Sequence, residues 1–211
     1  MHSVKRRIAC FCEKTFDADI PDSADLAAEP EVGRLIASGD FMAVTCPSCG
    51  KRLTPEFPFH LTLPGGVGDV LLVPEADRGA YVRGSLPYQV GSPYRVVVGF
   101  PELAEKLQVL GSGRDDRVIE IMKYYLLTGA AGSESEEDDR DVTLRYKGEE
   151  GGKHVFHVVG MKEGEIGVAR LASEIYGKIA ADVDARVQEE PFRDFCSPPW
   201  VSIRRLTGGE P

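Results

Sequence analysis

Cys46-Pro47-Ser48-Cys49-Gly50 is the stretch of sequence that most constrains the fold, because it has the pattern of a metal-binding turn. Two thiolates separated by two residues can reach one tetrahedral metal ion. Pro47 restricts the backbone between them, and Gly50 permits the positive φ that turns the chain back beneath the metal. A second pair, Cys10-Phe11-Cys12, lies upstream. Because alternate residues of a strand face the same side, we expect this pair to lie on a strand with both thiols directed at one ion.

Together the two pairs predict one structural zinc ion with four ligands: Cys10, Cys12, Cys46 and Cys49. Four thiolates leave no open coordination position, so such a site stabilises the fold and does not catalyse. The same ligands are compatible with iron. Two further interpretations stay open: buried thiols without a metal, and a redox switch formed by Cys10 and Cys12. The 33 residues between Cys12 and Cys46 form a long insertion, which adds little to the entropy of loop closure.

Composition limits the classes of function. The chain has 211 residues with 34 acidic and 25 basic side chains, a formal net charge of −9. This balance argues against bulk binding to nucleic acid or to anionic membranes, which needs a basic surface. No apolar run approaches the roughly 20 residues of a membrane-spanning helix. Five cysteines without a recognisable export signal do not indicate a disulfide framework, so we expect a cytoplasmic protein.

The cysteine motifs and their surroundings resemble the CpXC family of bacterial and archaeal proteins, whose name describes the motif at Cys46–Cys49. The resemblance covers about residues 8–128 and includes the Cys10–Cys12 pair, Tyr94–Leu103 and Asp115–Glu120. Two positions depart from the family pattern. Glu13 replaces the glycine after the first pair, and Leu61-Thr62-Leu63 replaces a polar Tyr-His-Asp-like triplet. The family is functionally uncharacterised, so the resemblance implies a metal site and a fold but no reaction.

Hydrophobic periodicity predicts an α+β fold with a zinc-ribbon-like antiparallel β module at its N-terminal end. The expected organisation is a CpXC-like domain at 1–130, made of a β part at about 1–100 and a helical pair at about 101–128, then an acidic linker at 131–141 and a C-terminal α+β part at 142–211. If the helical pair packs against the C-terminal part, the structural boundary lies near residue 100 instead.

Individual elements follow from the same periodicity. The first strand and its hairpin partner are expected at Val4–Cys10 and Lys14–Ile20, followed by a loop at Pro21–Pro30 and a helix at Glu31–Ser38. Alternation between Leu53 and Leu63 predicts a half-buried strand, at a sheet edge or interrupted by its two prolines. The C-terminal part is expected to form a hairpin from Val142–Tyr146 and Val155–Val159, one long amphipathic helix over Ile166–Val187, and a short strand at Trp200–Ile203.

No catalytic constellation emerges from the sequence. The four histidines, His2, His60, His154 and His157, lie beside no nucleophile motif, and His154 and His157 point to opposite faces of one strand. Cys196 is expected to be a buried, inert thiol.

These observations favour a metal-stabilised module that binds a protein partner or a second copy of the chain. A nucleic-acid-binding ribbon is also compatible with the sequence, through a local basic face made of Lys5, Arg6, Arg7, Lys14, Lys51 and Arg52. So are a thiol redox sensor that uses Cys10 and Cys12 and an enzyme with a site between the two halves of the chain.

Overall fold

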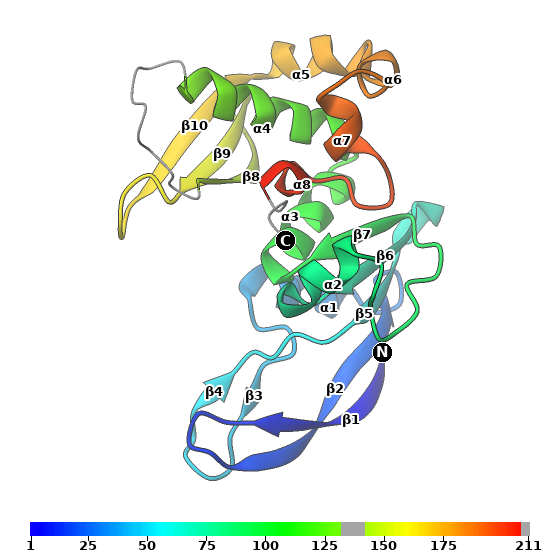
Figure 1. Ribbon diagram of the computed structural model, residues 1–211, viewed down its shortest axis with the longest axis vertical. Coiled ribbons are helices and arrows are strands. Elements are labelled where there is room, and N and C mark those ends of the chain that lie inside the picture. The colour runs from blue at the N-terminus through cyan, green and yellow to red at the C-terminus, as the bar shows by residue number, and fades with distance from the viewer. Residues whose placement is uncertain (132–141, 208–211) are drawn as a thin grey trace. The chain divides into compact units, whose positions relative to one another are not determined.

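The computed structural model describes residues 1–131 and 142–207, and its mixture of helices and sheets confirms the α+β class (Figure 1). The chain divides into two compact units, Met1–Ala104 and Glu105–Pro211. The predicted acidic linker at 131–141 lies, apart from its first residue, outside the described residues. Within the described ranges, no helix is both long enough and apolar enough to cross a membrane.

A mixed five-stranded sheet organises the first unit. Its strands lie in the order β1 (His2–Ala9), β2 (Thr15–Asp25), β5 (Phe59–Leu63), β6 (Gly68–Val73) and β7 (Arg95–Val98). The pairs β1–β2 and β5–β6 are antiparallel, whereas β2–β5 and β6–β7 are parallel. Residues 70–73 and 95–98 are buried, as expected for near-continuous apolar strands covered on both faces.

The middle of this sheet decides one prediction and corrects another: the two prolines interrupt the strand predicted between Leu53 and Leu63, as one of its two alternatives stated. β5 begins at Phe59, directly after Pro58, so both prolines precede the hydrogen-bonded ladder that they cannot join. β5 is therefore a short central strand, not an edge strand. β2 continues to Asp25 where a loop was predicted, because Ser23–Asp25 pair with His60–Thr62. The helix predicted to follow is confirmed as α1 (Pro30–Ser38), which ends at Gly39 with a φ of 77°.

Short elements complete the first unit. A two-stranded hairpin is formed by β3 (Val44–Thr45) and β4 (Arg52–Leu53). The turn between β5 and β6 is rich in glycine and contains the 3-10 helix η1 (Pro64–Gly66). A second 3-10 helix, η2 (Glu75–Asp77), leads into α2 (Arg78–Val82).

The second unit combines helices with a three-stranded antiparallel sheet. The strands lie in the order β10 (Ile166–Ala172), β9 (Lys153–Val159) and β8 (Thr143–Glu150). The predicted helical pair is confirmed as α3 (Phe100–Gly111), which begins at the end of the first unit, and α4 (Asp116–Ala131). Four shorter helices follow: α5 (Ser173–Ala180), α6 (Val183–Arg186), α7 (Phe192–Cys196) and α8 (Arg204–Thr207).

One hydrophobic core joins the helical pair to the C-terminal elements. Val118, Ile119, Ile121 and Met122 of α4 are fully buried and belong to the same cluster as the later residues Tyr146, Phe156, Ile179, Val183 and Phe195. Val109 of α3 belongs to it as well. The helices α3 and α4 therefore pack with strands and helices that follow residue 142.

The prediction of one long helix over Ile166–Val187 is wrong. Its first seven residues form β10, in which exposed and half-buried positions alternate, and helix begins only at Ser173. β10 pairs with β9 over its whole length, with Ile166 opposite Val159 and Ala172 opposite Lys153. This long-range pairing overrides a local pattern that also fits a helix. Residues Trp200–Ile203 are buried but form no strand, which corrects a second prediction.

Candidate metal centre

The structure brings the four predicted ligands together. The sulfur atoms of Cys10, Cys12, Cys46 and Cys49 all lie within 4.8 Å of one another. Cys10 and Cys12 occupy the turn between β1 and β2, and Cys46 and Cys49 occupy the turn between β3 and β4. None of the four forms a disulfide. Two turns that are far apart in sequence thus present four thiol groups to one point.

Two of the sulfur–sulfur distances match those of a tetrahedral metal site. The Sγ atoms of Cys10 and Cys49 are 3.6 Å apart, and those of Cys12 and Cys46 are 3.8 Å apart. Metal–sulfur bonds of about 2.3 Å in a regular tetrahedron place ligand sulfurs about 3.8 Å apart. A disulfide would need about 2.05 Å. The donor set and its spacing therefore fit a metal ion with four thiolate ligands.

Each cysteine pair is held by its own backbone turn. In the first turn, the Cys10 amide donates to the Lys14 carbonyl and the Glu13 amide donates to the Cys10 carbonyl, both at 2.9 Å. In the second, the Cys46 amide donates to the Lys51 carbonyl and the Gly50 amide donates to the Cys46 carbonyl, again at 2.9 Å. The expectation that Cys10 and Cys12 lie on a regular strand is wrong, since β1 ends at Ala9.

The residue after each pair has a left-handed backbone. Gly50 has a φ of 73° and Glu13 a φ of 65°. Glu13 is the residue that replaces the glycine expected from the family pattern. The turn keeps the conformation that glycine favours, at the steric cost that a side chain brings in this region.

Backbone amides already favour a thiolate at Cys46. Burial acts to raise the pKa of this thiol, but hydrogen bonds from the Cys49 and Ser48 N–H groups lower it to about 7. At Cys49 the Lys51 N–H acts to lower the pKa, yet the neighbouring thiols of Cys10 and Cys12 raise it to about 11. Four thiols in contact cannot all ionise unless a cation neutralises them.

An exposed aromatic residue lies between the first two cysteines. Phe11 leaves 81% of its surface accessible, the largest fraction among the exposed large hydrophobic side chains of the described residues. The Lys51 ammonium lies 4.4 Å from the centre of its ring. Sequence reasoning did not single out Phe11, although its place inside the Cys10–Cys12 motif was a signal that the turn would hold it at the surface.

The six basic residues near the cysteines do not form one free basic face. Lys5 and Arg7 lie opposite Asp19 and Asp17 in the β1–β2 register. The Arg6 guanidinium lies 5.3 Å from the centre of the Phe57 ring, and Arg52 forms an ion pair with Asp40. Lys14 and Lys51 are exposed, and neither forms an ion pair within the described parts of the chain.

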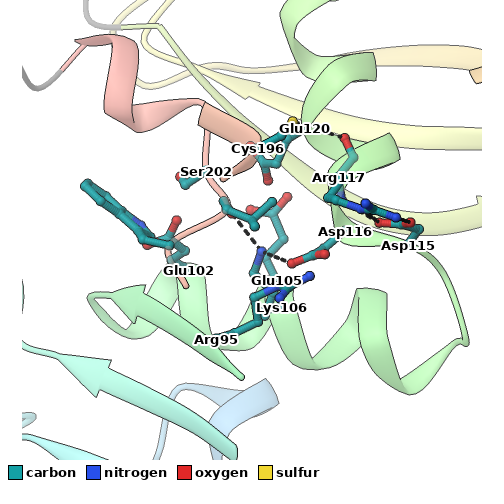
Figure 2. Close-up of polar contacts among 12 residues, drawn as sticks. Arg95, Glu102, Glu105, Lys106, Asp115, Asp116, Arg117, Glu120, Cys196 and Ser202 are labelled. Carbon is teal, nitrogen blue, oxygen red and sulfur yellow. Dashed lines mark hydrogen bonds and ion pairs between the residues drawn. The ribbon is translucent and has the colours of Figure 1, made fainter. Parts of the chain in front are cut away.

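A second cluster of charged groups lies buried in the second unit. The Lys123 Nζ atom is 2.6 Å from Glu105 and 2.8 Å from Glu120. Burial acts to lower the pKa of Lys123, but the two carboxylates outweigh it and raise the pKa above its ordinary value. Glu120 accepts from the Ile203 amide, and Glu105 accepts from the Tyr146 amide. Lys106 contacts both the Asp116 carboxylate and the Val201 carbonyl (Figure 2). Through Val201 and Ile203, these contacts hold the segment before α8 against α3 and α4.

Among the described residues, neither the histidines nor Cys196 belongs to the four-cysteine cluster. His154 is fully buried, its Nδ1 atom is 3.0 Å from the Tyr146 hydroxyl, and its Nε2 atom has no hydrogen-bond partner in the described structure. His60 is exposed on β5. Cys196 is buried, and burial raises the pKa of its thiol well above the usual range, which agrees with an inert residue.

Comparison with known proteins identifies one family and one relative. A family model described as "CpXC protein" matches residues 8–123. An uncharacterized protein of Treponema pallidum (strain Nichols) is 24% identical over 191 residues, covering 82% of this chain and 86% of that protein. No solved structure matches the chain.

Proposed function

The chain belongs to the CpXC protein family, and from its four-cysteine cluster we propose that it is a binding module stabilised by one structural zinc ion. The observation that carries the proposal is the position of the four sulfur atoms within 4.8 Å of one another. Zinc accepts four thiolates in tetrahedral geometry and has no redox chemistry that would need a further partner. With no open coordination position, the ion holds the two turns together and activates no water.

The small size of the β3–β4 hairpin supports the proposal of a metal. Each of these strands has two residues, and the turn between them is exposed at Ser48, Cys49 and Lys51. A hairpin of this size is not stable alone in water. The proposed ion replaces the hydrophobic core that the hairpin lacks, since it links the β3–β4 turn to the β1–β2 turn.

The partner of this module stays a prediction. The acidic balance of the chain favours a protein partner or a second copy, with nucleic acid as the alternative. The positions of the basic side chains support the alternative at one place, the turn that holds Cys10 and Cys12.

Metal analysis by plasma mass spectrometry, with thiol titration of native and unfolded protein, tests the proposal. We expect one zinc ion per chain, four thiols that react only after the metal is removed, and loss of the ion in Cys46→Ser. Cys196→Ser is the matched control, because this cysteine lies outside the cluster, and it should retain the metal. One iron per chain would replace zinc in the proposal. No metal, with readily reacting Cys10 and Cys12, would support a redox role instead.

A further inference from the structure

We propose that the turn Cys10–Lys14, with Lys51 beside it, binds single-stranded nucleic acid. Phe11 would stack on one unpaired base, and Lys14 and Lys51 would contact the neighbouring phosphates. The inference deepens the proposed function and rests on it, because the metal is what holds the two turns side by side.

The presentation of Phe11 is the first argument. An aromatic ring that is 81% exposed gains little from folding, so the turn keeps it at the surface at the expense of apolar burial. Its neighbours Cys10 and Cys12 are metal ligands in the proposed site, which fixes the backbone on both sides. The ring is therefore a rigid platform, and stacking on it costs little additional conformational entropy.

Charge around the ring is the second argument. Residues 1–20 and 41–54 hold six basic and three acidic side chains, a net charge of +3, within a chain of net charge −9. Lys5, Arg7 and Arg52 face carboxylates, which leaves Lys14 and Lys51 as the exposed cations closest in sequence to the metal ligands. Of these two cations, Lys51 contacts the Phe11 ring, and Lys14 follows in the same turn, which also carries the exposed carboxylate of Glu13.

The combination favours single-stranded nucleic acid over double-stranded nucleic acid and over acidic proteins. Lysine is depleted from protein–protein interfaces, whereas free lysines beside an exposed aromatic ring are typical of single-strand binding. A duplex keeps its bases stacked within the helix and offers the ring no open base face. The acidic remainder of the chain limits the contact to this turn, so we expect weak binding that depends steeply on salt.

Fluorescence anisotropy of labelled oligonucleotides with the full-length, metal-loaded protein tests the inference. The probes are oligo(dT), oligo(rU) and a duplex, each about 12 nucleotides long, at about 50 mM and about 200 mM salt. We expect both single strands to bind, and a preference between them identifies RNA or DNA as the natural source. Phe11→Ala should weaken binding by about 5- to 150-fold, whereas Phe11→Trp should retain it. Lys51→Gln should lower the salt slope by about 0.7.

Matched controls separate the site from general effects. Ile166→Ala removes another exposed apolar side chain and Lys178→Gln another exposed charge, both in the second unit, and neither should change binding. Phe11→Ala should keep its zinc ion, because the ring is exposed. Equal binding of the duplex, unchanged binding by Phe11→Ala, or binding by neither single strand would overturn the inference. The inference would also be overturned if no oligonucleotide binds and a protein partner is found whose binding requires Phe11. If the protein holds zinc but binds no oligonucleotide, only this inference is wrong. If the protein holds no metal, the proposed function is wrong.

Discussion

The metal-binding end of the first unit and the core of the second unit are stabilised in different ways. Around the cysteines, the hairpin is short, the turn residues are exposed, and Cys10 and Cys46 are the buried members of the cluster. In the second unit, twelve buried residues form a hydrophobic cluster, and a paired lysine lies between two carboxylates beside it. Under the proposed function, the first region depends on a bound ion, whereas the second depends on packing and satisfied charges.

Metal removal should have the largest effect and act on the first region alone. We expect a chelator to abolish protection of the Cys46 and Gly50 amides, because structural zinc contributes on the order of 10 kcal/mol to folding of small metal modules. Hydrogen exchange measured by mass spectrometry follows those amides. Trp200, the chain's one tryptophan and a buried residue of the second unit, provides the control, since its fluorescence should not change. A change at Trp200 would show that the two regions are not independent.

Removal of the buried lysine charge should destabilise the second unit and leave the first region unchanged. Lys123→Met leaves Glu105 and Glu120 buried without their cation, which costs about 3–5 kcal/mol. Urea unfolding followed by Trp200 fluorescence should show the loss, and metal content should stay unchanged. Lys178→Met, at an exposed position, is expected to stay within about 0.5 kcal/mol of wild type. If Lys123→Met lowers the free energy of unfolding no more than this control does, the buried charges contribute little to stability.

The pH dependence of the second unit should come partly from His154. Burial lowers the pKa of this histidine below 6.5, so the unfolded chain takes up the proton first as the pH falls. Stability is therefore lost as the pH falls below about 6.5, until the pKa of the folded state is passed. His154→Phe should flatten this slope, and loss of the Tyr146 hydrogen bond should cost about 1 kcal/mol near neutral pH. An unchanged slope between pH 7 and 5 would assign the effect to other groups.

The smallest expected effect is a gain in stability of the turn that holds Cys10 and Cys12. Glu13→Gly relieves a left-handed backbone at φ 65°, and after the greater flexibility of glycine is subtracted we expect a gain of about 0.5–1 kcal/mol. Resistance of the metal to chelation is a suitable measurement, because the first turn supplies two ligands. Gly50→Ala is the converse variant and should weaken retention. Weaker retention in Glu13→Gly would show that the glutamate side chain itself supports the turn.

Local motifs predicted the site better than they predicted the elements around it. Two cysteine pairs with short spacing specify a meeting point directly, and the structure brings all four thiols there. The turn geometry at Cys10 and Cys12 was not predictable in the same way. Both a strand and this turn can direct the Cys10 and Cys12 side chains to one side. The hydrogen bond from the Cys10 amide to the Lys14 carbonyl shows that the segment is a turn.

Long-range pairing accounts for the larger errors. The apolar residues of 166–187 fit a helical period, yet the first seven of these residues complete a sheet with β9, a partner that local periodicity does not identify. The extension of β2 to Asp25 depends in the same way on β5, whose paired residues lie 37 positions later in sequence. The buried pairing of Lys123 with Glu105 and Glu120 also escaped the sequence, because a charged residue on a helix is usually exposed.

The place of the insertion in the sheet has a consequence for the order of folding. The chain between Cys12 and Cys46 contains β2 and α1, and β2 forms the parallel pair with β5. During synthesis the first two ligands emerge long before the second two, and contacts over such separations form slowly. Under the proposed function, binding of the metal by all four ligands must therefore wait until Cys46 and Cys49 have been synthesised. Until then, the first thiol pair is exposed to oxidants and to competing metals in the nascent protein.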